Sequence, residues 1–530
     1  MQLQSYLRYR LECSELYVGD FMNHSMTASR ETKYSGYTDL CQLQHSPMEG
    51  VMNIDELIIN EHLSIRDALV KIDANTKGVV FVVDNNNSLV GILTDGDIRR
   101  ALLNGKTIDD ATALVMNKNF FALPVDAELA TINKGLQGSI KIIPLVNQHN
   151  QVVDYATHLR NKIISVASPF LNGNELEYVS DCLKTSWISS QGKYVKDFEA
   201  VLSKFCQQPF AVAVSNGTVA IHLALAALGI GSGDEVIVPD FTFAATINAV
   251  IYTGATPVIA EVERDTWTIS PNSINRLITK NTKAIIPVHI YGHACKMDEI
   301  LHIAQKHSLY IIEDVAEALG SEYKSKPLGC FGDAATFSFF GNKTITTGEG
   351  GMVLFKDADI AHKAQLLRDH GMSKDRRYWH ELVGFNYRMT NIQAAIGVAQ
   401  MEQVNKFVNK KIELAARYNA AFAKLPHIML PPNMGWGKNS YWLYTLKLQS
   451  SNMRDEMINK LKKNNIESRP CFYPLHIMPP YCDFRRDESL QNSIEIAECG
   501  ISLPSSVSLS EHDQEVVIDI FTQLLLNLTN

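Results

Sequence analysis

FSFFGNKTITTGEGG, residues 337–351, places one lysine in a polar, glycine-rich turn directly after an aromatic run that is typical of a strand. A lysine amine can attack a carbonyl and form a Schiff base when its surroundings lower its pKa. Small and hydroxyl-bearing neighbours let a flat cofactor lie against the backbone and offer donors to a phosphate. The alternative is a solvated lysine in a surface loop, and other parts of the sequence are needed to distinguish between the two.

Length and composition limit the classes of protein. A chain of 530 residues is too long for one hydrophobic core, and 46% hydrophobic with 20% charged residues is typical of globular domains. The net charge of −8 gives no reason to expect a nucleic acid or an anionic membrane as partner. The sequence contains no apolar run long enough for a membrane span, and its N-terminus lacks a signal-peptide pattern. Nine scattered cysteines without a Cys-x-x-Cys predict reduced thiols in the cytoplasm and no metal site.

The N-terminal residues 1–50 are polar and rich in Ser, Thr and Tyr, without clear periodicity. We expect poor order there. The patterned sequence begins after them, which suggests the hypothesis that translation starts at Met48 or Met52.

A small α/β module is predicted over residues 51–160. Two apolar runs, residues 78–84 and 88–93, read as strands and are followed by a helix that opens at Thr94. The Gly-x-x-Thr-x-x-Asp spacing that ends at Asp97 resembles a CBS domain. A second copy, from residue 113 to about residue 160, lacks the Thr-x-x-Asp and is therefore degenerate. The resemblance implies an adenine nucleotide contacted by Thr94 and Asp97, and a packing or oligomerisation module is the alternative.

The remainder reads as a large α/β domain, residues 165–405, and a small C-terminal domain, residues 406–530. Short apolar runs such as residues 235–239, 284–288 and 309–314 alternate with helical periods. This alternation predicts a mostly parallel sheet, in which ligands gather at the carboxyl ends of the strands.

Three features in this domain together match the three groups that bind pyridoxal phosphate: an anion site, an acid and an amine. A Ser/Asn/Gly/Thr turn at residues 215–218 precedes a helix that is predicted to be strongly amphipathic, and a helix N-terminus of this kind makes an anion site. Asp314 ends a predicted strand, where it is either a helix cap or the partner of a pyridine nitrogen. Lys343 then supplies the amine for the aldehyde. Their order along the chain favours cofactor binding over three unrelated surface features.

A series of motifs carries a resemblance to the DegT/DnrJ/EryC1/StrS family of nucleotide-sugar aminotransferases, which have the fold-type I architecture. Besides the lysine stretch, they are WISSQG (187–192), SNGT (215–218) with PDFTFAAT (239–246), EDVAEA (313–318), GFNYRMTNIQ (384–393) and SRPCFYPLH (468–476).

The resemblance implies roles for individual residues. Lys343 matches the Schiff-base lysine and Asp314 the partner of the pyridine nitrogen, while Phe243 matches an aromatic residue that stacks on the ring. Glu317 lies one helical turn after Asp314, where other members often have His or Gln. The positions that match phosphate contacts are Gly217, Thr218 and Ser338.

A second group of residues implies an oligomer. Asn386 and Arg388 match a segment that reaches the cofactor phosphate of a partner subunit, so a homodimer with shared active sites is expected.

The resemblance also implies the reaction. Members with His in place of the lysine catalyse dehydration, so Lys343 favours transamination from glutamate to a nucleotide-linked 4-keto-6-deoxy sugar, as used in surface polysaccharides such as O-antigen. Likeness within the family favours a GDP-linked sugar, and UDP- and dTDP-linked sugars stay open, as does a non-catalytic regulator built on the CBS pair. Candidate sugar or nucleotide contacts are Tyr291, His293, His370 and Arg469.

Overall fold

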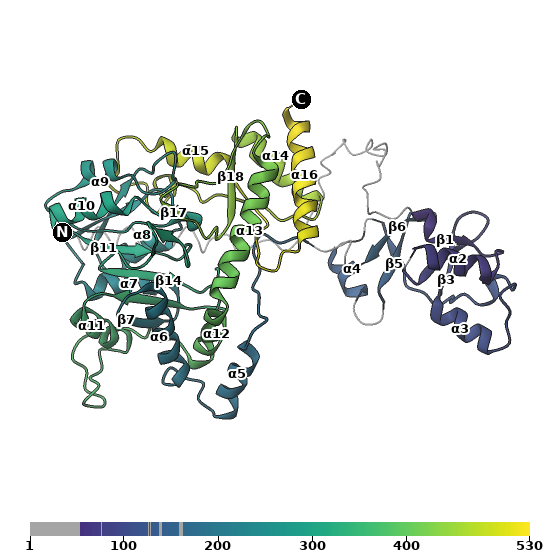
Figure 1. The fold of residues 1–530 in the computed structure, drawn as a ribbon, viewed down its shortest axis with the longest axis horizontal. Helices are drawn as coiled ribbons and strands as arrows, with labels where there is room; N and C mark the ends of the chain where they lie inside the picture. The colour runs from purple at the N-terminus through teal and green to yellow at the C-terminus, as the bar shows by residue number, and fades with distance from the viewer. Residues whose placement is uncertain are drawn as a thin grey trace, which may run out of the picture. The chain divides into compact units, whose positions relative to one another are not determined.

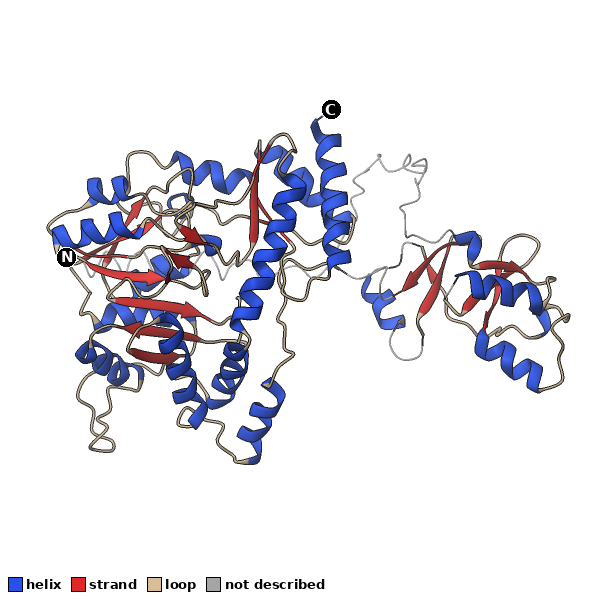
Figure 2. Cartoon of the chain, viewed as in Figure 1, coloured by secondary structure: helices blue, strands red, loops and turns tan. Residues whose placement is uncertain are grey.

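The computed structural model describes residues 54–529, except 76, 126, 128, 137–139 and 158–162. The chain divides into two compact units, the first of which ends at Thr157, and each is described by itself (Figures 1 and 2). The predicted poorly ordered extension and the proposed start at Met48 or Met52 lie outside the described residues. No helix in the described part of the chain is long and apolar enough to cross a bilayer.

The described residues of the first unit form two small sheets with the same pairing pattern. In each sheet the first strand pairs parallel with the second, and the second pairs antiparallel with the third. All five residues of β2 are buried, which explains its uninterrupted run of Val and Phe. The elements are β1 (Ile58–Asn60), α2 (Ile65–Asn75), β2 (Val79–Val83), β3 (Leu89–Thr94), α3 (Asp95–Leu103), β4 (Leu123–Pro124), α4 (Leu129–Gly135), β5 (Ile142–Val146) and β6 (Val152–Thr157).

The second unit is built on a seven-stranded sheet of order β7-β15-β14-β11-β10-β8-β9 in the described residues. Strand β15 runs antiparallel to both of its neighbours, and the other pairs are parallel, as the alternation of strands and helices predicts. The strands are β7 (Phe210–Val214), β8 (Glu235–Pro239), β9 (Thr256–Ala260), β10 (Thr282–Ile285), β11 (Tyr310–Asp314), β14 (Ala334–Ser338) and β15 (Gly351–Phe355).

Helices cover both faces of this sheet (Figure 2). Successive strand residues alternate between two hydrophobic cores: Val212 and Val214 belong to one, and Ala213 to the other. Helices α7, α8 and α11 pack on the first core, and α6, α9, α10 and α12 on the second. The helix bounds are α5 (Glu175–Lys184), α6 (Lys193–Cys206), α7 (Gly217–Ala227), α8 (Ala245–Tyr252), α9 (Pro271–Leu277), α10 (Met297–His307), α11 (Ala358–Arg368) and α12 (Asn391–Glu402).

A smaller sheet of order β16-β18-β20-β19 forms the C-terminal part. Helix α13 joins it to the larger part, because Phe407 packs in a core of the large sheet and Tyr418 in the C-terminal core. The division at residue 405 therefore falls inside one continuous helix and stays a proposal. The elements are α13 (Val404–Phe422), β16 (Ile428–Met429), β18 (Tyr444–Leu448), α14 (Ser451–Lys463), β19 (Arg469–Pro470), α15 (Gln491–Cys499), β20 (Gly500–Leu503) and α16 (Glu511–Thr529), with a separate three-stranded sheet of β12 (Glu322–Tyr323), β13 (Lys326–Pro327) and β17 (Gly437–Lys438).

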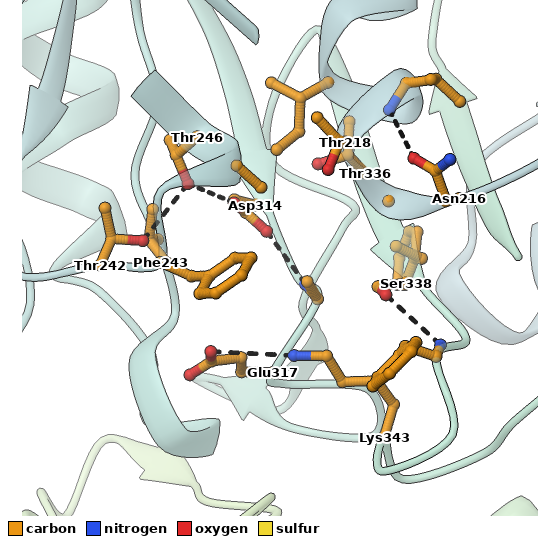
Figure 3. A pocket seen from close by; sticks show the side chains of 18 of the residues that line it. Asn216, Thr218, Thr242, Phe243, Thr246, Asp314, Glu317, Thr336, Ser338 and Lys343 are labelled. Carbon is orange, nitrogen blue, oxygen red and sulfur yellow. Dashed lines mark hydrogen bonds and ion pairs between the residues drawn. The ribbon is translucent and has the colours of Figure 1, made fainter. Parts of the chain in front are cut away.

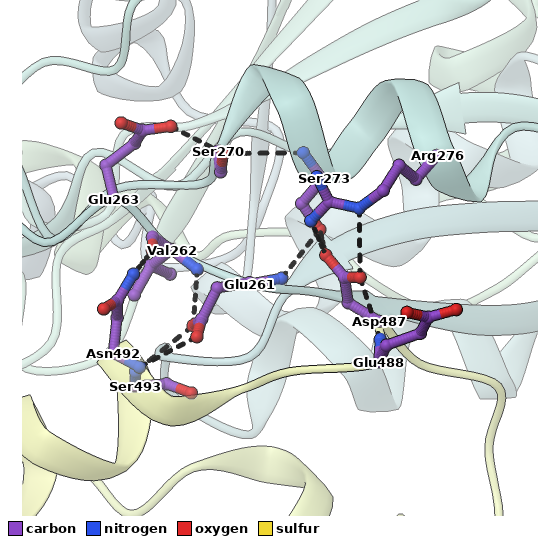
Figure 4. A network of polar contacts seen from close by, with 10 residues as sticks. All are labelled: Glu261, Val262, Glu263, Ser270, Ser273, Arg276, Asp487, Glu488, Asn492 and Ser493. Atoms are coloured by element: carbon purple, nitrogen blue, oxygen red, sulfur yellow. Dashed lines mark hydrogen bonds and ion pairs between the residues drawn. The ribbon is translucent and has the colours of Figure 1, made fainter.

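A polar network fastens the chain before and at the start of α15 to the large sheet (Figure 4). The carboxylate of Glu261, just after β9, accepts N–H bonds from Asn492 at 2.8 Å and Ser493 at 3.2 Å. Asp487 accepts a bond from Arg276 of α9 at 3.2 Å. Because these carboxylates are buried and multiply bonded, they hold this C-terminal segment against the end of β9 and against α9.

Candidate active site

A cavity of about 610 Å³ opens at the carboxyl ends of β8, β11 and β14 and at the N-terminus of α7 (Figure 3). Cavities of this position and size are the usual ligand sites of parallel α/β sheets. Seven residues predicted from the sequence line it: Gly217, Thr218, Phe243, Asp314, Glu317, Ser338 and Lys343.

Asp314, the last residue of β11, supplies a buried carboxylate to the cavity. Its Oδ2 accepts a hydrogen bond from Thr246 Oγ1 at 2.9 Å, and its Oδ1 accepts one from the N–H of Ala316 at 3.1 Å. Burial raises its pKa, and the two hydrogen bonds and the charge of Lys343 counteract that rise. A positive charge placed against this carboxylate would favour its ionised form.

Lys343 lies in the loop after β14, and its backbone N–H donates to the carbonyl of Phe340 at 2.9 Å. Its Nζ lies 3.8 Å from Glu317 Oε1 and 3.7 Å from the centre of the Trp442 ring. Burial lowers the pKa of this amine, and the charges of Glu317 and Asp314 oppose the effect. A lysine held this way reaches the neutral, nucleophilic form more readily than a solvated one.

Glu317 is the second buried carboxylate of the cavity, with 4% of its surface exposed. The expected helical turn between Asp314 and Glu317 is wrong, because residues 315–320 form turns after β11 and no helix. Burial raises its pKa to about 7, although Lys343 and the N–H of Tyr291, which donates to Oε2 at 2.9 Å, favour the charged form. Near neutral pH this carboxylate is therefore divided between its charged and neutral forms.

The opposite end of the cavity suits an anion. Helix α7 begins at Gly217, and the side chain of Asn216 caps it by accepting the N–H of Val219 at 3.0 Å. A Cβ on Gly217 would lie 2.8 Å from that of Ser338, so only glycine allows the helix start to lie this close to the end of β14. The helix N-terminus and the hydroxyls of Thr218 and Ser338 can bind a phosphate.

An aromatic wall completes the site. The Phe243 side chain is 58% exposed within the cavity lining, and its ring centre lies 5.8 Å from that of Phe472. A flat apolar face between an acid, an amine and an anion cradle fits the ring of pyridoxal phosphate. The residues present therefore fit this cofactor.

Three predicted residues gather on another part of the same unit. Arg388 pairs with Asp369 at 2.9 Å, donates from Nε to Asn386 Oδ1 at 3.2 Å, and lies 3.4 Å from His370 Nε2. The backbone of Arg388 pairs with Val214 at the end of β7. None of the three predicted residues lines the cavity of this chain.

The other predicted substrate contacts do not line the cavity either. Tyr291 is buried and stacks on Trp442, and His293 is buried against Trp436, where burial lowers its pKa to about 4. Arg469 pairs with Glu467 at 2.8 Å.

In the first unit, Thr94 and Asp97 bond to each other. The N–H of Asp97 donates to Thr94 Oγ1 at 3.2 Å and the N–H of Thr94 donates to Asp97 Oδ2 at 3.0 Å, which forms a capping box on α3. Thr94 Oγ1 also donates to Asp97 Oδ2 at 2.6 Å. Arg100 pairs with the other carboxylate oxygen at 2.6 Å. These side chains thus stabilise the N-terminus of α3.

The sequence interpretation missed three residues of the cavity. Thr246 lies four residues after Thr242, and this helical spacing could have indicated that the two side chains lie close together. Phe472 lies in a quoted motif but was not singled out. Trp442 comes from a distant segment before β18, and no spacing in the sequence connects it with Lys343.

Comparisons with known proteins agree with this geometry. The model of the DegT/DnrJ/EryC1/StrS aminotransferase family matches residues 169–522, and that of the CBS domain matches residues 48–104. The chain belongs to the DegT/DnrJ/EryC1/StrS aminotransferase family.

The matches include almost the whole length of the relatives. GDP-perosamine synthase of Caulobacter vibrioides is 47% identical over 370 residues, which are 68% of this chain and 98% of the relative. GDP-perosamine synthase of Escherichia coli O157:H7 is 46% identical over 352 residues, 66% of this chain and 95% of the relative. The PLP form of Spr1654 from Streptococcus pneumoniae has a TM-score of 0.65 at 28% identity and covers 68% of this chain and 98% of that one.

These findings confirm several expectations. The chain has the fold-type I architecture, its cofactor is pyridoxal phosphate, and it is a nucleotide-sugar aminotransferase with an N-terminal CBS domain. The degenerate second CBS copy and the role of each site residue stay predictions.

Replacing Glu317 by Gln tests the electrostatics of the site in cofactor-free protein. Ionised Glu317 stabilises the ammonium form of Lys343, so removal of its charge should lower the pKa of Lys343. Above pH 7 the neutral fraction of Lys343 should therefore rise several-fold, because a pKa shift of one unit changes that fraction about ten-fold. Below about pH 6, where Glu317 is protonated, variant and wild type should converge. The rate at which a small amine-reactive reagent modifies Lys343, read by peptide mass spectrometry, measures this.

The matched control is Glu349→Gln, which changes an exposed carboxylate of the same cavity. Equal modification rates for Glu317→Gln and wild type at every pH would contradict the assignment.

Proposed function

We propose that this protein transfers the amino group of glutamate to the keto carbon of a GDP-linked 4-keto-6-deoxy sugar, in a pathway of surface polysaccharide synthesis. The observation that carries the proposal is one cavity that contains the Lys343 amine, the Asp314 carboxylate and an anion cradle at α7. The nucleotide is inferred from relatives named GDP-perosamine synthase at 46–47% identity.

Each cavity residue has a proposed role. Bound pyridoxal phosphate supplies an electron sink for the carbanion formed at the reacting carbon. Asp314 holds a proton at the pyridine nitrogen, and Phe243 orients the ring by stacking. Lys343 Nζ binds the cofactor's aldehyde carbon and later carries the proton that leaves the substrate carbon. Gly217, Thr218 and Ser338 bind the phosphate.

The charge of the cavity supports a homodimer. Among the described residues that line it, Lys343 is the only cation, beside the carboxylates of Asp314, Glu317 and Glu349. A cofactor phosphate is left without a cationic partner from this chain. We therefore propose that Arg388, with Asn386, reaches the phosphate of the partner subunit, and that substrate contacts such as His370 belong to the same shared site.

Adenine-nucleotide binding is proposed for the CBS pair, with Thr94 and Asp97 as contacts. The repeated strand pairing of the two small sheets supports a pair. Calorimetric titration of the full chain with AMP, ADP and ATP should give heat with at least one nucleotide. No heat with any of them would leave a packing role.

We further propose that the protein works in the cytoplasm without a nucleic acid partner. The net charge of −8 and the seven free cysteines among the described residues support this.

A substrate screen tests the function. With glutamate as donor, the purified protein is offered GDP-, UDP-N-acetyl- and dTDP-linked 4-keto-6-deoxy sugars, and amino-sugar formation is measured by mass spectrometry. The GDP-linked sugar should react fastest, and Lys343→Ala should abolish turnover with all three. A different preferred nucleotide would replace the proposed substrate, and no amino sugar from any of them would refute the proposal.

Subunit mixing tests the shared site. Lys343→Ala and Arg388→Ala homodimers should both be strongly impaired, because each lacks one part of every site. Refolding the two variants together should restore part of the activity, since a mixed dimer contains one site with both residues intact. Continued inactivity of the mixture, with mixed dimers shown by mass spectrometry, would place Arg388 in the same chain's site or outside it.

A further inference from the structure

Trp442 lies against the amine of the active-site lysine. The centre of its ring is 3.7 Å from Lys343 Nζ, within the range of a cation–π contact. The side chain lines the catalytic cavity and is 4% exposed, so the contact is shielded from water. A shielded contact of this kind is stronger than one at the surface.

The indole is held in place on several sides. Its Nε1–H donates to the carbonyl of Asn342, the residue before the lysine, at 2.8 Å. Its ring stacks on Tyr291 with centres 6.1 Å apart and planes 13° apart. Its own carbonyl accepts a bond from Lys411 Nζ at 3.0 Å, and Lys411 also donates to the carbonyl of Ser505 at 2.8 Å. The ring is thus tied both to the lysine loop and to the C-terminal part of the unit.

The buried Lys411 suits this anchoring role. Burial lowers its pKa to about 7, and a neutral amine has two N–H groups, one for each of the two carbonyls. Both hydrogen bonds can therefore form without a buried charge, and the backbone of Trp442 stays fixed.

The only described carboxylate within ion-pair distance of Lys343 Nζ is that of Glu317, at 3.8 Å. Because the pKa of Glu317 is about 7, this carboxylate is charged only part of the time at neutral pH. The π face of Trp442 does not titrate, so it offers the ammonium a constant partner.

We propose that Trp442 is a positioning residue for Lys343, whose π face stabilises the ammonium form and fixes the direction of Nζ. The proposal rests on the proposed role of Lys343 as proton carrier. When Nζ no longer holds the cofactor, it takes up the proton that leaves the substrate carbon, and the indole stabilises the cation that results. The ring also prevents the flexible lysine side chain from turning away from the reacting carbon.

Fluorination of one indole tests this without changing the shape of the side chain. Tryptophan with no, one or three fluorine atoms is placed at position 442, since fluorine withdraws the π density that attracts a cation. In cofactor-free protein, the pH midpoint for modification of Lys343 by a small amine-reactive reagent should fall with each added fluorine, by about one pH unit for the trifluoro form.

The same series at Trp436, which contacts His293 and Tyr323 and does not line the cavity, should leave the midpoint unchanged. Trp442→Phe should retain most of the wild-type midpoint, and Trp442→Leu should match the trifluoro form. A midpoint that does not move, or that rises because water enters, would overturn the proposal even if Trp442→Leu failed to fold, because the fluorinated forms retain the packing. Since the measurement needs neither cofactor nor sugar, a failed substrate screen would leave its result standing.

Discussion

The buried charges around Lys343 are the constraint on which the rest of the site depends. An amine and two carboxylates, each of them largely buried, lie together in one cavity, and isolated buried charges are unstable. The protein offsets this with Thr246 on Asp314 and with the π face of Trp442 on Lys343. The cost of burial that is not offset raises the pKa values of the two acids and lowers the pKa of the amine. A lowered pKa favours the neutral amine, which is the form that a lysine nucleophile needs.

The parallel sheet is what brings these groups together. Asp314 pairs with Thr336 across β11 and β14, so the chain that leaves β14 starts beside the carboxylate and returns Lys343 to it. The turn after β7 places the start of α7 against Ser338 at the same edge. The C-terminal part adds Trp442 and Phe472 from outside the sheet. Both parts of the second unit therefore contribute to the lining of the cavity.

Features that depend on nearby residues could be predicted from the sequence. The apolar runs predicted the strands β8 (Glu235–Pro239) and β11 (Tyr310–Asp314). Acids and glycines at the ends of predicted strands indicated which residues are candidates to bind the cofactor. Strand β10 begins and ends earlier than expected, at Thr282–Ile285. Pro287 has no N–H to donate to the ladder, and beyond it only an isolated bridge joins Val288 to Asp314. Trp442 could not be predicted, because its contact with Lys343 depends on how the C-terminal part packs. Whether Arg388 works in a partner's site depends on a second chain.

The central claim is that Lys343 is the residue that binds pyridoxal phosphate. Reduction of the purified, cofactor-loaded protein with borohydride, followed by peptide mapping, tests this most directly, because it fixes the cofactor on the amine to which it is bound. The phosphopyridoxyl group is expected on Lys343, in the peptide that contains residues 337–351. A label on another lysine, or none after saturation with cofactor, would contradict it.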